Sequence, residues 1–196
     1  MKKTSDFHKS EMLNYFTSKF EKYFKNHTYG NIPTKFIQRI GSLDSGQHIV
    51  GVVKVLEQWK EVYKNAENYI YNILSEVPYT KDVIEELVAK MEKDVKVKSI
   101  FSETAIIPKE RKEIFEKINF KKFIDKEIIQ RRMMKKVDAV VILNEKEACL
   151  MLPSSKGDID ISEMIFSKDP EFHEWCLDFF KDCWEKSSLF QERKLK

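Results

Sequence analysis

The sequence predicts an α/β protein in which helices cover a mixed sheet. Strand-like and helix-like segments alternate through the first two thirds of the chain, as they do where helices join parallel strands. The last third is richer in strands, because the polar turn Asn144-Glu145-Lys146 splits the apolar runs 137–143 and 148–152, which is typical of two adjacent antiparallel strands. Both kinds of connection in one chain indicate a mixed sheet.

An amphipathic helix is expected first, over residues 7–24. Its residues Leu13, Phe16, Phe20 and Tyr23 recur at spacings of three, four and three, the start of a heptad seam. One interpretation is that this helix packs on its own domain. The other is a dimer helix, because the polar segment 27–31 separates it from the body of the chain. We predict a homodimer through these four side chains.

The chain is expected to divide near Asn31. Residues 1–31 form a connecting or dimerising helix, residues 32–190 form the α/β domain, and residues 191–196 form a tail. No period of 20 to 50 residues repeats and no linker divides the body, so no further division is expected.

The next elements follow from apolar spacing, capping residues and turn residues. We first expect a short helix that Pro33 opens and Gly41 ends as a left-handed cap, and then a strand at 47–53 that merges into a helix at 52–66. A strand at 69–74 and a helix capped by Thr80 should follow. The last of these elements are a strand at 95–101, a helix opened by Pro108, and a strand at 127–134.

The end of the chain is expected to place a helix over the sheet. After a loop with Gly157, an apolar run at 161–166 predicts another strand, and Asp169-Pro170-Glu171 has the residue types of a helix start. The apolar arc of this helix contains Phe172, Cys176, Leu177, Phe179, Phe180, Cys183 and Trp184. Such a one-sided helix covers a core.

The order strand, strand, glycine-bearing loop, strand and closing helix resembles the end of the sensor domain in archaeal winged-helix transcriptional regulators of the methanogenesis-regulatory type. The residues that carry the resemblance are Leu152-Pro153, Gly157-Asp158, Ser167-Lys168-Asp169 and Glu174-Trp175 to Phe179-Phe180, with Ile32-Pro33 to Arg39-Ile40-Gly41 upstream. The resemblance covers about residues 32–187.

This resemblance implies a phospholipase-D-like sensor fold and a ligand-sensing, dimerising domain of a transcriptional regulator. The chain departs from the family in one respect, because nothing before Phe7 is expected to form a winged helix. DNA is therefore an expected partner only through a winged helix that this chain lacks.

No catalytic residue is expected. Catalysis of the phospholipase-D type needs a His-x-Lys motif, and the sequences after His8, His27, His48 and His173 all fail this test. A degenerate phosphodiesterase-like enzyme acting on a small anionic substrate is the alternative hypothesis, and a structural adaptor that uses its N-terminal helix is a third.

No cofactor and no metal ion are expected. His173, Cys176 and Cys183 fall on nearly one helical face, but phenylalanines already fill that face, and structural zinc usually takes four ligands from close pairs. Buried thiols are the favoured interpretation.

A ligand site is expected where strands end, since open α/β sheets bind ligands outside the carboxyl ends of their strands. Ser75 and Glu76 follow one strand, and Ser102 and Thr104 follow the next. Adjacent strand residues point to opposite faces, so one arginine of a neighbouring pair should point inward.

The predicted ligand-binding residues are Ser75, Glu76, Ser102, Thr104, Arg131 and Arg132. The inward arginine either provides charge for a small acidic metabolite or pairs with a carboxylate such as Glu76 or Glu103.

Composition narrows the class of protein. The 35 basic and 32 acidic residues leave a net charge of +3, which provides no global electrostatic reason for nucleic-acid binding. Three cysteines give no disulfide framework, no signal peptide is seen, and no apolar stretch approaches the ~20 residues of a membrane span. The expectation is a soluble cytoplasmic protein without a membrane partner.

Overall fold

A computed structural model describes residues 2–75, 80–105, 113, 118–159 and 161–191. The strands form one eight-stranded sheet in the order β1-β7-β6-β5-β2-β3-β4-β8. Their bounds are β1 Gln47–Val50, β2 Tyr69–Leu74, β3 Lys96–Ser102, β4 Ile129–Met134, β5 Val140–Leu143, β6 Ala148–Met151, β7 Glu163–Ser167 and β8 Ser188–Leu189. Strands β2, β3 and β4 are parallel and all other pairs are antiparallel. The predicted mixed sheet is confirmed.

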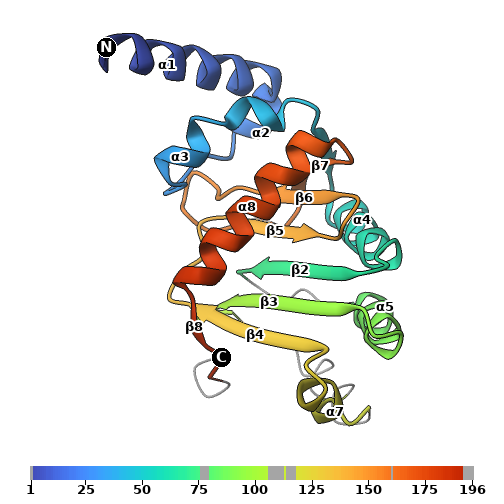
Figure 1. The fold of residues 1–196 in the computed structure, drawn as a ribbon. Coiled ribbons are helices and arrows are strands. Elements are labelled where there is room, and N and C mark those ends of the chain that lie inside the picture. The colour runs from blue at the N-terminus through green and yellow to red at the C-terminus, as the bar shows by residue number, and fades with distance from the viewer. Residues whose placement is uncertain (1, 76–79, 106–112, 114–117, 160, 192–196) are drawn as a thin grey trace.

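Helices cover both faces of this sheet (Figure 1). Tyr71 and Asn72, which are neighbours in β2, contact helices on opposite faces of the sheet. The ring of Tyr71 stacks on Phe180 of helix α8 (Pro170–Lys186), whereas Asn72 accepts a hydrogen bond from the Tyr63 hydroxyl of helix α4 (Val52–Lys64). Helix α5 (Lys81–Glu92) packs beside α4. None of the described helices combines the length and the apolarity that a membrane crossing requires.

Helix α8 begins as its sequence predicts. The Asp169 carboxylate accepts hydrogen bonds from the N–H groups of Glu171 at 2.9 Å and Phe172 at 3.3 Å, which satisfies two amides that have no partner inside the helix. Trp175 is also fully buried: its ring packs against Phe36 of helix α3 (Thr34–Ile37), and its Nε1 donates to the carbonyl of Phe36. The helix is therefore covered on a second side that the apolar arc did not include.

The N-terminal segment, helices α1 (Lys2–Lys19) and α2 (Glu21–Phe24), belongs to the same core as the sheet. Phe16 and Tyr23 are fully buried and Phe20 is 6% exposed, while Leu13 is half-buried. The expectation that these side chains lack a partner within the chain, and so form a dimer surface, is wrong for the three aromatic residues. Homodimerisation itself stays a prediction, without an assigned surface.

Two hydrogen bonds tie this segment to the sheet across the expected boundary at Asn31. The N–H of Leu152 donates to the Tyr23 hydroxyl at 2.7 Å, and the N–H of Thr28 donates to the carbonyl of Pro153 at 2.8 Å. Residues 2–31 are therefore packed as part of one body with the sheet.

Three further expectations differ from the structure. Gly41 lies inside the 3-10 helix η1 (Ile40–Leu43) and is not among the glycines with positive φ, so it is no left-handed cap. Gly51 has φ +105° and separates β1 from α4, because a sharp change of direction there needs a residue without a Cβ. A short helix α7 (Lys121–Asp125) was not expected. The helix predicted from Pro108 and the ligand residue Glu76 lie outside the described residues.

Candidate functional site

A small pocket lies where β2 and β3 end. Its described lining is Ser75, Ser102, Thr104, Lys136, Val137, Gly157, Asp158 and Ile159, and its volume is about 90 Å³. Because β2 and β3 pair in parallel, their carboxyl ends lie side by side. The structure thus brings together three of the predicted ligand residues, the two serines and the threonine.

The hydroxyl groups of this pocket differ in how they are satisfied. Ser102 is buried, its Oγ lies 2.8 Å from Oγ1 of Thr104, and the N–H of Thr104 donates to the same Oγ at 3.3 Å. The Oγ of Ser75 is buried and has no hydrogen-bond partner in the described part of the chain. A buried hydroxyl without a partner costs about 1–3 kcal/mol, so this position favours a bound water or ligand atom.

The opposite wall comes from a loop that carries one of the sequence motifs of the resemblance. Gly157 has φ +89°, and a Cβ added there would lie 3.7 Å from Nζ of Lys136. The loop is closed by backbone hydrogen bonds from Ser154 N to Asp158 O and from Gly157 N to Ser154 O. Lys136 and Asp158 are both exposed, so one amine and one carboxylate stand at the rim.

Size limits what this pocket holds. A water molecule occupies about 30 Å³ in the liquid, so about 90 Å³ accommodates a few waters or one phosphate-sized group. Pockets for whole drug-sized molecules are about 300–1,000 Å³. The arrangement can bind one small polar or anionic group through hydroxyl donors and the amine of Lys136.

Arg131 and Arg132 do not reach this pocket, which corrects the sequence prediction. Nη1 of Arg132 donates to the carbonyls of Trp184 at 3.0 Å and Ser187 at 3.4 Å. Its guanidinium group lies 4.8 Å from the centre of the Trp184 ring. Arg132 therefore meets the carbonyl end of α8, where a cation is favourable, instead of a ligand in this pocket, and Arg131, equally half-buried, lies against the Phe190 ring at 4.1 Å.

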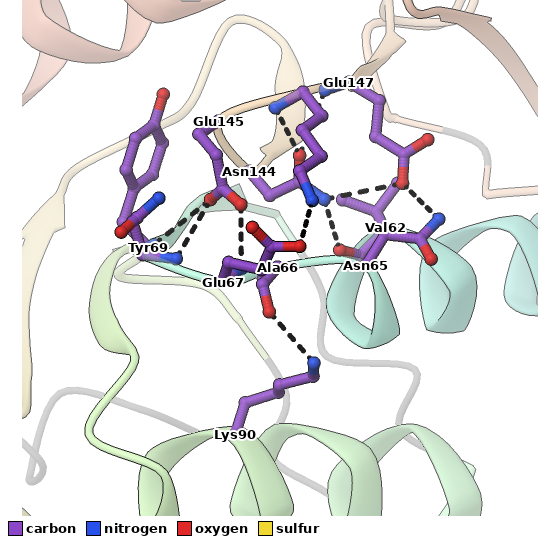
Figure 2. Close-up of polar contacts among 11 residues, drawn as sticks. Val62, Asn65, Ala66, Glu67, Tyr69, Lys90, Asn144, Glu145 and Glu147 are labelled. Carbon is purple, nitrogen blue, oxygen red and sulfur yellow. Dashed lines mark hydrogen bonds and ion pairs between the residues drawn. The ribbon is translucent and has the colours of Figure 1, made fainter.

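At the other end of the strands, where β2 begins, a network of polar contacts surrounds Glu145 (Figure 2). The Glu145 carboxylate accepts from the N–H groups of Glu67 at 2.7 Å, Asn68 at 3.3 Å and Tyr69 at 3.3 Å. Partial burial opposes ionisation, but these N–H donors outweigh it, so the pKa of Glu145 lies below its ordinary value. The carboxylate clamps the loop that leads into β2.

The buried polar residues beside Glu145 are equally occupied. The side chain of Asn144 donates to the carbonyl of Val62 at 2.7 Å and accepts from the N–H groups of Lys146 and Glu147. The Glu147 carboxylate, 1% exposed, accepts from Asn65 at 2.8 Å and forms an ion pair with Lys168. A carboxylate held by these partners is a poor candidate for general acid–base chemistry.

No metal site is found in the part of the chain that the structure describes, where no group of three or more His, Cys, Asp or Glu residues could hold an ion. The three cysteines are free and buried, as the sequence favoured. Burial raises the pKa of Cys183 to about 12 and raises that of Cys149 as well, so both thiols stay protonated at neutral pH.

The fold is similar to that of several solved structures. TrmBL2, described as an archaeal chromatin protein with a novel mode of DNA binding, has a TM-score of 0.54 at 14% identity over 74% of this chain and 52% of that one. Nuc, a phospholipase D family member from Salmonella typhimurium, has a TM-score of 0.52 at 16% identity over 75% of this chain and 99% of that one. Phosphatidylserine synthase from Haemophilus influenzae Rd KW20 has a TM-score of 0.52 at 11% identity over 74% and 39%.

These similarities establish the fold alone, a phospholipase-D-like α/β fold, because the identities are low. The chain spans about half the length of TrmBL2. No protein-family model matches the sequence, and no curated protein matches it. The neighbours include both a DNA-binding archaeal protein and phospholipase D family members.

Proposed function

We propose that this chain is the ligand-sensing domain of an archaeal transcriptional regulator and that its pocket binds a small anionic metabolite without chemical turnover. The observation that carries the proposal is the buried Oγ of Ser75, which lacks a described partner and lines the pocket together with Ser102, Thr104 and Lys136. Hydroxyl groups and an amine bind an anionic oxygen through hydrogen bonds, which are stronger when one partner is charged.

The described lining of the pocket has two ionisable side chains, Lys136 and Asp158, and both are exposed at the rim, which supports a binding role over catalysis. No histidine is among the described pocket residues. His48 is held by Glu163 at 2.6 Å, and Nε2 of His173 lies 2.6 Å from the carbonyl of Asn144. Both imidazole rings are therefore engaged by residues that do not line the pocket. The structural similarity to TrmBL2, described as a chromatin protein with a novel mode of DNA binding, agrees with a regulatory setting.

Ligand binding is tested by thermal unfolding with a panel of phosphate-bearing and carboxylate-bearing metabolites, with inorganic phosphate and sulfate included. A ligand at ten times its Kd stabilises the folded state by about 1.4 kcal/mol, which raises Tm by about 3–6 °C for a chain of this size. We expect Ser75→Ala and Lys136→Ala to lose most of that shift. Lys135→Ala, at the exposed neighbouring residue, is the matched control and should keep it. A panel in which no compound raises Tm would contradict the proposal.

The alternative, a phosphodiesterase-like enzyme, is favoured by the similarity to Nuc. We expect no hydrolysis of bis-p-nitrophenyl phosphate, because no His-x-Lys motif is present. Turnover that co-purifies with the protein and is abolished by Lys136→Ala or Ser102→Ala would establish an enzyme instead of a sensor.

A further inference from the structure

A second hollow, of about 500 Å³, lies at the outer edge of the sheet. Four consecutive residues of β4, Ile129 to Arg132, line it. Because consecutive strand residues point to opposite faces, a hollow that all four contact cannot lie on one face. It runs along the edge of the strand.

Among the described residues, the last strand, β8, pairs with only part of the outer edge of β4. Strand β8 pairs only with Arg132 and Met133. On the other side of β4, Val97 N donates to Ile128 O and Glu103 N donates to Met134 O, so the backbone groups of the even-numbered residues face β3. The N–H and C=O of Ile129 therefore point to the outer edge, beside the hollow, where an added strand would pair.

The side chains around this edge combine apolar contact with positive charge. Leu189 is 77% exposed and Ile124 is 38% exposed. On the α8 side, the Trp184 ring lies under the guanidinium of Arg132 and 5.2 Å from Nζ of Lys98. Among the described residues, neither Arg132 nor Lys98 forms an ion pair with a carboxylate. Glu127 is the one carboxylate of the described lining.

We propose that the β4 edge binds an extended acidic peptide by strand addition. Main-chain hydrogen bonds to Ile129 would provide affinity, and alternate side chains would provide specificity. Carboxylates on the α8 side would meet Arg132, which lines the hollow, and apolar side chains on the other side would meet the exposed side chain of Ile124. This site is separate from the pocket at Ser75, so it is independent of the proposed ligand.

A single-stranded nucleic acid fits the same charge less well. Bases bind such surfaces by stacking on free aromatic faces, but the rings here are already stacked on other side chains. Trp184 stacks on Phe180 with centroids 5.6 Å apart and also lies under Arg132. Tyr71 lies between Phe180 and Tyr69, at 4.7 and 4.3 Å. In the part of the chain that the structure describes, no strand pairs with Ile129 on this side, and such an edge is a feature that a peptide uses and a nucleic acid does not.

The test uses the full chain and a fluorescein-labelled ten-residue peptide in which valine and glutamate alternate, followed by fluorescence anisotropy. Two matched peptides replace glutamate by lysine throughout or replace one central valine by proline, which removes a backbone donor. Arg132→Glu reverses the charge at the site, and Gln130→Glu adds repulsion at an exposed position of the same face. Lys54→Glu, an equal charge change on exposed α4 surface, is the control.

We expect the acidic peptide to bind and both the lysine and the proline peptides to bind at least tenfold more weakly. Arg132→Glu and Gln130→Glu should each weaken binding at least threefold, whereas Lys54→Glu should not. The Gln130 variant keeps the test valid if the Arg132 variant unfolds. Equal binding of the proline peptide, no binding of the acidic peptide at 1 mM, or displacement of the peptide by oligo-dT would overturn strand addition.

Discussion

Asp169 shows how one side chain sets the start of an element. Its carboxylate satisfies the amides of Glu171 and Phe172, and replacing such a cap by alanine costs about 0.5–2 kcal/mol. We expect Asp169→Ala to lower the free energy of unfolding by about 1 kcal/mol in urea denaturation. Asp169→Asn keeps an oxygen acceptor and should retain most of the stability. An alanine variant as stable as the parent would show that the cap contributes nothing.

The clamp at Glu145 predicts a dependence of stability on pH. Its folded-state pKa is lowered, because backbone N–H donors outweigh the opposing effect of burial. A lowered pKa means that the stabilisation is complete above the unfolded-state pKa, about 4.3, and is lost as pH falls through the folded-state value. We therefore expect the difference in unfolding free energy between the parent and Glu145→Gln to shrink on going from pH 7 to pH 3.

Urea titrations at several pH values measure this difference. Glu57→Gln, at an exposed residue of α4, is the control and should show no such trend. A Glu145→Gln effect that stays constant over this range would mean that ionisation of the carboxylate does not contribute.

At the level of elements, the N-terminal segment is held through Tyr23. The N–H of Leu152, buried at the end of β6, has the Tyr23 hydroxyl as its partner at 2.7 Å. Removing the hydroxyl leaves a buried donor unsatisfied, which costs about 1–3 kcal/mol. We expect Tyr23→Phe to lower the free energy of unfolding by that amount, whereas Tyr15→Phe, at a 60% exposed residue, should be neutral. Equal effects from both would rule out the contact as a source of stability.

Local signals predicted most elements but not their partners. The bounds of β2 and the start of α8 followed from apolar spacing and from Asp169-Pro170, because the forces that define them act within a few residues. The docking of Phe16 and Tyr23 could not be predicted, since the same aromatic stripe suits a second copy of the chain and a distant part of its own core. The position of Trp175 depends on α3, which is 139 residues away in the sequence.

The same distinction applies to the candidate site. Ser75 and Ser102 were predicted together because both follow strands that are neighbours in sequence, and parallel pairing brings their ends to one edge. Lys136 follows β4, whose carboxyl end lies beside that of β3 because the two strands are parallel. Which of Lys136, Arg131 and Arg132 reaches the pocket could therefore be decided only from the pairing of these strands. The loop at Gly157 could be placed only once the strand order was known.

For the whole molecule, the structure predicts one cooperative unit from helix α1 to helix α8. Phe16 is fully buried in the same core cluster as Cys149 of β6 and Cys176 of α8. Truncating a buried phenylalanine to alanine costs about 3–5 kcal/mol, and a shared core distributes that loss over the chain. We expect Phe16→Ala to shift a single unfolding transition that tryptophan fluorescence and circular dichroism report together.

Thiol labelling tests this coupling directly. Cys149, Cys176 and Cys183 are buried, so each reacts only after the structure opens, at a rate that follows the population of the open state. Phe16→Ala should accelerate labelling of all three at least a hundredfold, roughly tenfold for each 1.4 kcal/mol. Met12→Ala, at a 40% exposed residue of the same helix, is the control and should leave the rates unchanged. If the N-terminal segment instead unfolded alone, Phe16→Ala would produce two transitions and would not alter labelling of the thiols between the sheet and α8.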